Sequence, residues 1–244
     1  MKITMLGCGT SVGVPALGQA GWGKCNPEDE RNRRQRCAVL VEVSGKVILV
    51  DAGPDIRNQL IPLGLNKIDA LLITHTHSDH VAGLDDLRAF YWPNRDDIPV
   101  HATKQHSREI LERFPYLFSK REESPSYFIP PMKMQIIAAG DKLDIGGCRI
   151  DVLHQDHGNT NSLGFLFDKK LKEIKIGISL IADNESSIEM LVIEEDPINQ
   201  FQFNDFKEKE SVDIIYVEQF NEDLWKGYSI IEPTKQMKDY KKIN

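Results

Sequence analysis

The sequence predicts a layered α/β sandwich. Its 244 residues are 41% hydrophobic, which is enough apolar material for one sizeable core. Strand and helix patterns occur in two successive halves, and neighbouring strands form hairpins more often than βαβ units. Frequent hairpins favour a sandwich over a doubly wound parallel sheet. We therefore expect a single domain over residues 1–244, with a diverged or shortened C-terminal part after about residue 184.

The first half begins with a meander of short, buried strands. The dipeptide Ser44-Gly45 between two of them is typical of a tight two-residue hairpin turn. Apolar residues at helical spacing follow these strands. The expected strands are 2–6, 38–43, 46–50 and 70–74, and the expected helices are 55–63, 79–91 and 104–114.

A proline-bearing connector at residues 122–132 precedes a second set of strands. Residues 184–210 are acidic, and one more buried strand is expected at 212–217. We interpret the connector as part of a single domain. The other strands expected in this half are 133–138, 142–145, 148–153, 162–167 and 174–181.

The composition excludes several classes of protein. The formal net charge is −7, and a negative chain binds long nucleic acid poorly because that affinity comes largely from contacts of Lys and Arg with phosphates. No apolar run approaches the roughly 20 residues that span a bilayer, and no signal-peptide core precedes Gly7. We expect a cytoplasmic protein with no membrane partner. A small anionic substrate is compatible with this charge if a metal or a local basic patch supplies positive charge.

The strongest functional signal is the string His-Thr-His-Ser-Asp-His at residues 75–80, between an apolar strand and a helix. Residues two apart in extended backbone project to the same side, so His75 and His77 can share one metal ion. The turn into the helix lets Asp79 and His80 reach a neighbouring position that a second ion could fill. The alternative interpretation is a polar turn with incidental histidines, although such ligand clusters are rarely structural filler.

A metal site needs further ligands, and the later chain offers three candidates. His154 and His157 are three residues apart in an extended segment and face opposite ways, which favours His157, at the exit of the strand, as a ligand. We expect His154 to be a strand residue with a local hydrogen bond. Asp183 follows another apolar strand and could bridge two ions, although its context also suits a helix N-cap.

Several segments resemble the metallo-β-lactamase-fold hydrolases. The resemblance rests on the string at residues 75–80, on the strand and turn at 47–53 and on the later His and Asp candidates. The segments GCGTSVGVP at 7–15, WGKC at 22–25 and NRRQRC at 32–37 look like the PhnP-like branch of that superfamily, bacterial phosphodiesterases that act on small cyclic or nucleotide-like phosphates. The likeness is close from residue 1 to about 90 and faint after residue 183.

The resemblance implies a fold, a cofactor and a set of site residues. The fold is an αβ/βα sandwich of two mixed β-sheets flanked by helices. The cofactor is Zn²⁺ or Mn²⁺, one or two ions per chain, which activates water and clamps the phosphoryl oxygens. Asp79 is the implied catalytic residue, which binds metal and orients the attacking water. The implied ligands are His75, His77 and His157 for one ion, Asp79 and His80 for the second, and Asp183 as a bridge.

Asp51, which follows the strand at 46–50, is also given a role by the resemblance. It would orient the imidazole ring of a metal ligand. The alternative that the local sequence allows is an ordinary turn residue before Gly53.

The chain departs from the family pattern at its late histidines. The family supplies one late histidine to the second ion and another that assists the leaving group, whereas this chain has no histidine after His157. The departure fits a diverged or truncated C-terminal part. His101 or His106 could substitute in principle, but both lie in or beside the expected helix 104–114, where we expect solvated surface histidines.

Two further patterns each allow two interpretations. Four arginines between residues 31 and 36 form a local patch suited to phosphate, or a solvated loop. Cys8, Cys25 and Cys37 could assemble a structural zinc site, as some relatives of the branch do, although ordinary thiols are favoured because no two of them are close in sequence.

A homodimer is a further candidate assembly.

Three functions are compatible with these observations. The leading hypothesis is a metal-dependent phosphodiesterase. A second hypothesis keeps the metals but changes the substrate to a thioester, lactone or lactam. A third is a catalytically weakened metal-binding protein, which the missing late histidines and the acidic residues 184–210 motivate.

Overall fold

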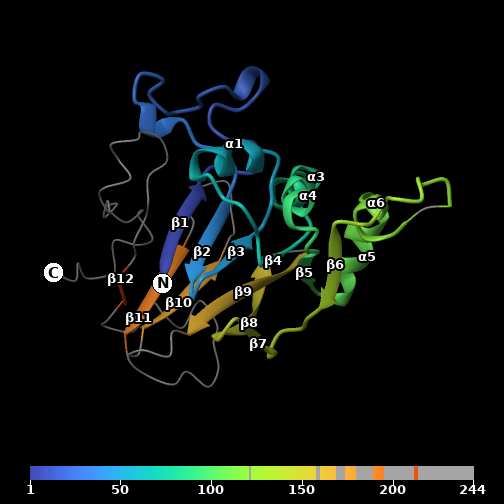
Figure 1. The fold of residues 1–244 in the computed structure, drawn as a ribbon. Helices are drawn as coiled ribbons and strands as arrows, with labels where there is room; N and C mark the ends of the chain where they lie inside the picture. Colours follow the sequence, from blue (N-terminus) through green and yellow to red (C-terminus); the bar gives the residue numbers. More distant parts are fainter. Residues whose placement is uncertain (121, 158–159, 169–173, 180–188, 195–211, 214–244) are drawn as a thin grey trace.

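Two six-stranded β-sheets form the frame of the computed structural model (Figure 1), which describes residues 1–120, 122–157, 160–168, 174–179, 189–194 and 212–213. The first sheet consists of β1 (Lys2–Gly7), β2 (Ala38–Val43), β3 (Lys46–Val50), β4 (Ala70–Leu72), β5 (Ile98–Ala102) and β6 (Met132–Ile136). The second consists of β7 (Lys142–Ile145), β8 (Cys148–His157), β9 (Thr160–Asp168), β10 (Ile174–Ser179), β11 (Glu189–Glu194) and β12 (Val212–Asp213).

The two sheets differ in strand direction. In the first sheet, β1, β2 and β3 pair antiparallel, and the pairs from β3 to β6 are parallel. In the second sheet, every pair among the described strands is antiparallel. The expectation of two mixed sheets is therefore wrong for the second one, because its described strands pair in sequence order, which favours antiparallel neighbours.

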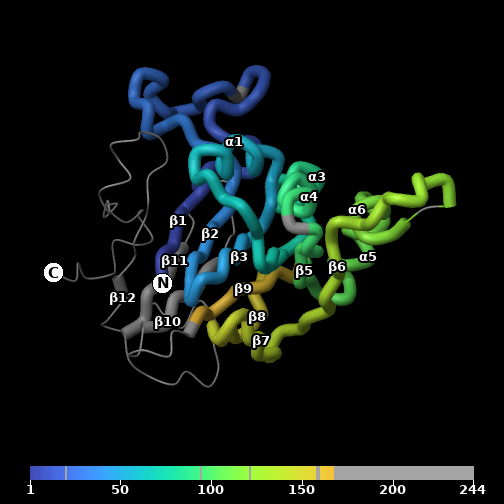
Figure 2. Tube along the Cα trace, in the orientation of Figure 1, coloured from blue at the N-terminus to red at the C-terminus, as the bar shows by residue number. Residues whose placement is uncertain are grey.

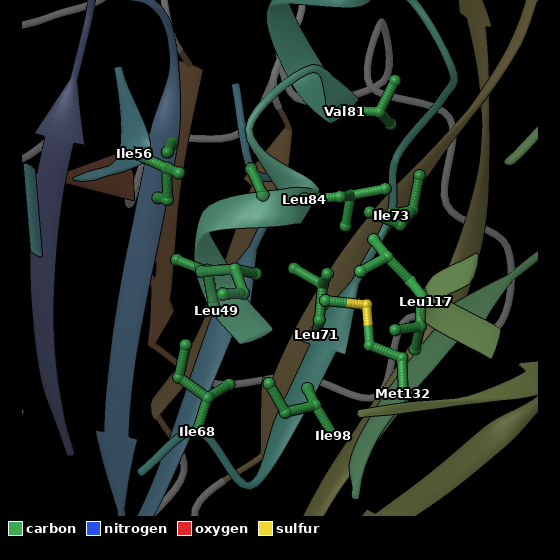
Figure 3. Packing of buried hydrophobic residues seen from close by; sticks show 14 of the residues in the cluster. Leu49, Ile56, Ile68, Leu71, Ile73, Val81, Leu84, Ile98, Leu117 and Met132 are labelled. Atoms are coloured by element: carbon green, nitrogen blue, oxygen red, sulfur yellow. The ribbon is translucent and has the colours of Figure 1, made fainter. Parts of the chain in front are cut away.

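The described helices all precede β7 in the chain, and they pack on the first sheet. Side chains of α1, α3, α5 and α6 join those of the strands in one buried apolar cluster, part of which is drawn in Figure 3. None of the described helices is long and apolar enough to cross a bilayer. The helices are α1 (Ile56–Leu60), α2 (Ser78–Val81), α3 (Leu84–Leu87), α4 (Tyr91–Asn94), α5 (Lys104–Arg113) and α6 (Pro115–Phe118).

A second buried cluster lies between the two sheets. Val39 and Val41 of β2 face it together with Val152 of β8 and Phe165 of β9, whereas Leu40 belongs to the cluster under the helices. This alternation follows from the two-residue period of a strand. The first sheet is therefore covered on both faces, which fixes the strand ends that carry the polar residues described below.

Several expected elements are confirmed, and others need correction. Ser44 and Gly45 form the tight turn between β2 and β3, with positive φ at both residues (52° and 74°). The expected helix 79–91 is instead divided into α2, α3, a 3-10 turn and α4. The strand β5, which was not expected, contains Pro99, a residue that argues against a central strand. The acidic segment 184–210 contains the strand β11.

The long segment between β1 and β2 lies beyond one end of the first sheet, next to α1 (Figure 2). Its two ends run side by side, since Gly9 N–H donates to the carbonyl of Gln35 at 2.7 Å and Val14 N–H to that of Arg34 at 2.9 Å. The side chain of Gln59 in α1 donates to the carbonyl of Arg36 at 2.8 Å. These contacts attach the segment to the end of the sheet at which β3 and β4 finish.

Candidate metal centre

Asp51 and Thr74 follow the neighbouring parallel strands β3 and β4, so they meet at one edge of the first sheet. The Asp51 carboxylate is fully buried. Its Oδ1 accepts a hydrogen bond from the N–H of Thr74 at 2.8 Å, and its Oδ2 accepts one from the Thr74 hydroxyl at 2.6 Å. Asp51 has a φ of 61°, in the left-handed region that a non-glycine residue adopts rarely and that often marks functional sites.

His75, His77 and His157 form the one cluster of potential metal ligands found among the described residues, with ligand atoms all within 4.8 Å of one another. Nε2 of His75 lies 3.1 Å from Nδ1 of His77. A tetrahedral zinc ion with Zn–N bonds of 2.0–2.1 Å places its nitrogens about 3.3 Å apart. Two of the three donors already have nearly this spacing, and three imidazole nitrogens are a donor set that zinc accepts. The residues present therefore fit a zinc ion.

The three ligand candidates differ in exposure. His75 is fully buried, His157 is half-buried and His77 is exposed. A site that is buried at one donor and open at another can admit both an ion and a further molecule. Nε2 of His77 lies 3.4 Å from the hydroxyl of Thr160, at the start of β9. This contact leaves Nδ1 of His77 directed toward His75.

Thr74 determines which nitrogen of His75 carries its proton. The Thr74 hydroxyl hydrogen is used on Asp51, so its oxygen accepts from Nδ1 of His75 at 3.0 Å. Nε2 of His75 is then left with a free lone pair, as a metal ligand requires. Burial, and then the positive charge that the neighbouring histidines can carry, lowers the pKa of His75 far below its ordinary value. The ring therefore stays neutral at physiological pH.

His80 lies between two carboxylates. Its Nδ1 is 2.6 Å from Oδ2 of Asp51, and its Nε2 is 3.2 Å from Oδ2 of Asp79. Burial alone would lower the pKa of His80, but Asp51 and then Asp79 raise it to about 9. Burial would raise the pKa of Asp79, but the hydrogen bond and charge of His80 lower it. The His75 and His80 ring centroids are 4.0 Å apart, so the Asp79–His80 pair adjoins the three histidines.

Two glycines let α2 lie against the turn that carries Asp51. A Cβ added at Gly83 would be 2.0 Å from the carbonyl oxygen of Gly53, and one added at Gly53 would be 2.0 Å from that of Asp79. The main chains are joined there, since Ala52 N–H donates to the carbonyl of His80 at 2.7 Å. This close approach brings His80 within reach of Asp51, and Gly83 also ends α2 early.

The structure places the other candidate residues as follows. His154 is exposed in β8, and its Nε2 is 3.3 Å from Oδ1 of Asn161, in agreement with the local hydrogen bond expected. Asp183 lies outside the described residues. The expectation of solvated surface histidines is wrong for His106, which is buried on α5, and for His101, which is half-buried in β5. Burial lowers the pKa of both rings.

Two residues of α5, Glu109 and Arg113, contact the ligand segment and were not among the residues predicted from the sequence. Thr76 lies between His75 and His77 and is buried. Its hydroxyl donates to Oε2 of Glu109, and its carbonyl accepts from Nη1 of Arg113 at 2.6 Å. A signal was present in the sequence: residues 106, 109 and 113 share one helical face with buried Ile110.

The arginines at 31–36 serve the segment between β1 and β2. Arg31 donates two hydrogen bonds to Asp29, at 2.9 and 2.8 Å. Arg36 pairs with Asp55 at 3.0 Å, and the guanidinium of Arg33 stacks on the ring of Trp22. These contacts favour a structural interpretation over a phosphate patch.

None of the four cysteines forms a disulfide, and none belongs to the histidine cluster. Cys37 and Cys148 are buried, while Cys8 and Cys25 are partly exposed. Burial, and then the neighbouring Cys8 thiol, raises the pKa of Cys37. These observations favour ordinary thiols over the structural zinc site.

The chain is similar in sequence to several known proteins. A family described as "Beta-lactamase superfamily domain" matches residues 46–176. The chain is 34% identical over 166 residues to a protein named octanoyltransferase from Porphyromonas gingivalis, covering 68% of this chain and 32% of that protein. It is 30% identical over 156 residues to ribonuclease Z of Bradyrhizobium diazoefficiens, covering 62% of this chain and 49% of that enzyme. The chain thus spans about a third of the first curated relative and about half of the second.

Among solved structures, a diphosphatase from the PhnP family is 32% identical to the chain. The match has a TM-score of 0.59 and covers 68% of this chain and 61% of that protein. The family match extends over more than half of the residues and includes the whole string at 75–80. The chain belongs to the metallo-β-lactamase superfamily.

Proposed function

We propose that the protein is a metal-dependent hydrolase, and within that class a phosphodiesterase that acts on a small cyclic or nucleotide-like phosphate. The observation that carries the proposal is the convergence of His75 and His77, in the loop after β4 of the first sheet, with His157 at the end of β8 of the second sheet. The Asp79–His80 pair adjoins them. Imidazoles and carboxylates gathered at strand ends are a donor set for divalent metals.

The three histidines would hold a Zn²⁺ ion, because nitrogen donors suit zinc better than the oxygen-preferring Mn²⁺. Asp79 and His80 would hold a second ion where one is bound. When bound, such ions supply Lewis acidity and lower the pKa of coordinated water. We assign to Asp79 the orientation of the attacking water, since its carboxylate adjoins the histidines and its low pKa keeps it an acceptor. Asp51 would keep the ring of His80 in one orientation.

The choice of phosphorus as the centre attacked is supported by the relatives. One matched structure is named a diphosphatase, and a matched curated protein is ribonuclease Z, whose name denotes cleavage of RNA phosphodiesters. The net charge of −7 makes a small phosphate a better substrate class for this chain than a long nucleic acid.

The proposal is tested by hydrolysis of bis(p-nitrophenyl) phosphate with purified protein supplied with Zn²⁺ or Mn²⁺. We expect turnover that depends on metal and that falls at least about 100-fold in Asp79→Ala, the scale on which positioned acid–base groups act. The matched control is Asp86→Ala, because Asp86 is an exposed aspartate of the following helix α3.

A parallel panel of a thioester, a lactone and a lactam identifies the centre that is attacked. Metal-dependent turnover of one of these, without turnover of the phosphodiester, would replace phosphodiesterase by a hydrolase that attacks carbon. Metal binding without any turnover would instead support the catalytically weakened metal-binding protein.

A further inference from the structure

The contacts of Thr76 extend the candidate metal centre onto α5. His75 and His77 project to one side of the chain, so Thr76 between them projects to the other. On that side its hydroxyl donates to Glu109 and its carbonyl accepts from Arg113 at 2.6 Å. Thr76 is thus held at its side chain and at its main chain by two residues of one helix.

The helix that holds Thr76 is itself firmly placed. It follows β5 directly, and the Thr103 hydroxyl caps it by accepting from the N–H of His106 at 3.1 Å. Ile110, on the same face, is completely buried in the cluster beneath the first sheet. Glu109 is further fixed by Gln105, whose Nε2 donates to its Oε1 at 3.3 Å. The position of Thr76 is therefore tied to the core.

The carbonyl that Arg113 binds has a direct effect on His77. The carbonyl of Thr76 and the N and Cα of His77 belong to one planar peptide unit. A carbonyl oxygen held in place therefore sets the direction in which the main chain continues through His77. His77 is the exposed member of the three histidines, and its outer nitrogen Nε2 has a long contact of 3.4 Å with the Thr160 hydroxyl. Among the ligand candidates, His77 is therefore the one that most needs support from its main chain.

We propose that Arg113 and Glu109 are positioning residues of the metal centre: by holding Thr76 they set the separation between the donor nitrogens of His75 and His77. This inference rests on the proposed metal site, and it assigns to α5 a role in metal affinity. Neither residue belongs to the cluster of potential metal ligands. The bond from Arg113 is charge-assisted and therefore stronger than a neutral one.

The test compares Arg113→Met with Arg108→Met in full-length protein. Arg108 is exposed on another face of α5, so it controls for the loss of a guanidinium from this helix. The first measurement is the Kd for Zn²⁺ by competition with a chelating dye. We expect Arg113→Met to bind zinc about 10- to 100-fold more weakly, as for other residues that orient ligands, and Arg108→Met to bind as the unmodified protein does.

A second measurement reports geometry and not only affinity. The visible absorption of protein loaded with Co²⁺ depends on the arrangement of its ligands, so we expect Arg113→Met to change these bands and Arg108→Met to preserve them. Glu109→Gln keeps an acceptor for the Thr76 hydroxyl, whereas Glu109→Ala does not, so the first should retain more zinc affinity than the second. Thermal unfolding of the metal-free variants verifies that each is folded.

The outcomes separate this inference from the function on which it rests. A protein that binds no zinc before any substitution overturns the metal site and the inference together. Tight zinc binding that is unchanged in Arg113→Met and in Glu109→Ala overturns only the role of α5. Weaker binding and altered Co²⁺ bands in Arg113→Met, with both preserved in Arg108→Met, support it.

Discussion

Oδ2 of Asp51 lies 2.6 Å from Nδ1 of His80, and the same oxygen accepts the hydroxyl of Thr74 at 2.6 Å. One buried carboxylate therefore orients His80 directly and His75 through Thr74. Both rings belong to the candidate metal centre, one to each proposed position. The network links two strand ends of the first sheet to the helix that follows the second of them.

Replacement of Asp51 by asparagine tests this network. The amide side chain would keep the shape of the carboxylate but lose its negative charge. It would also lose one acceptor oxygen, Oδ2, which His80 and Thr74 share. We expect Asp51→Asn to weaken zinc binding about 10- to 100-fold, measured by competition with a chelating dye. Asp86→Asn is the control, because Asp86 is exposed on α3. Equal zinc affinity in the two variants would mean that Asp51 does not orient the ligands.

Thr74 carries the contact from Asp51 to His75. Thr74→Val removes the hydroxyl and leaves buried polar atoms of Asp51 and His75 without that partner. We expect a loss of about 1–3 kcal/mol in the free energy of unfolding, measured by urea denaturation of metal-free protein. Thr74→Ser keeps the hydroxyl and should recover most of the loss. A serine variant as unstable as the valine variant would assign the effect to packing instead.

The close approach at Gly83 gives a prediction about packing. An added Cβ would lie 2.0 Å from the Gly53 carbonyl oxygen and 2.6 Å from the Ile56 side chain. We expect Gly83→Ala to reduce the free energy of unfolding by about 1–3 kcal/mol or more, as overpacking does. The neighbouring Ala82 is exposed, so Ala82→Ser serves as the control. A fully stable Gly83→Ala protein would show that this turn can move apart.

Acid should destabilise the metal-free protein. The pKa values of His75, His106 and His157 are lowered, chiefly by burial. Below pH 6.5, the ordinary pKa of histidine, these rings therefore bind protons in the unfolded chain but not in the folded chain. Protonation favours the unfolded state, so the population of that state rises as the pH falls. We expect the free energy of unfolding to fall between pH 7 and pH 5.5, measured by urea denaturation in the presence of a chelator. A value that is constant or rises over this range would contradict the neutral state of these rings.

His80 makes the opposite contribution at higher pH. Its pKa is about 9 in the folded protein and ordinarily 6.5, so its ion pairs with Asp51 and Asp79 stabilise the metal-free fold fully below pH 6.5. This stabilisation is lost as the pH rises through 9. The difference in unfolding free energy between the unmodified protein and Asp51→Asn should therefore shrink from pH 7 to pH 10. A constant difference would show that His80 is not charged in the fold.

Several contacts of the candidate site could be predicted from the sequence because their signals are local. Residues two apart in an extended chain lie on one side of it. This rule predicted that the side chains of His75 and His77 lie together, and they do. The same alternation favoured His157 over His154, and His154 is indeed on the exposed side of β8. The resemblance to the metallo-β-lactamase-fold hydrolases, which implies that Asp51 orients the ring of a metal ligand, anticipated the contact of Asp51 with His80.

What the sequence analysis missed depends on contacts between distant segments. The prediction of one helix over 79–91 failed because Gly83 lies against Gly53, a contact that helical periodicity does not report. The strand β5 was hidden by Pro99, a residue that argues against a central strand. His106 was expected at the solvated surface because it lies in the helix 104–114, but its spacing from Ile110 places both residues on the buried face of α5.

The metal content of the purified protein decides whether His75, His77 and His157 form a metal site. It is measured by mass spectrometry for the unmodified chain, for His157→Ala and for His154→Ala, two substitutions of the same residue type in one strand. We predict that the unmodified protein and His154→Ala retain zinc after dialysis and that His157→Ala loses most of it. Absence of metal from the unmodified protein, or equal retention in His157→Ala, would contradict the assignment of His75, His77 and His157 as a metal site.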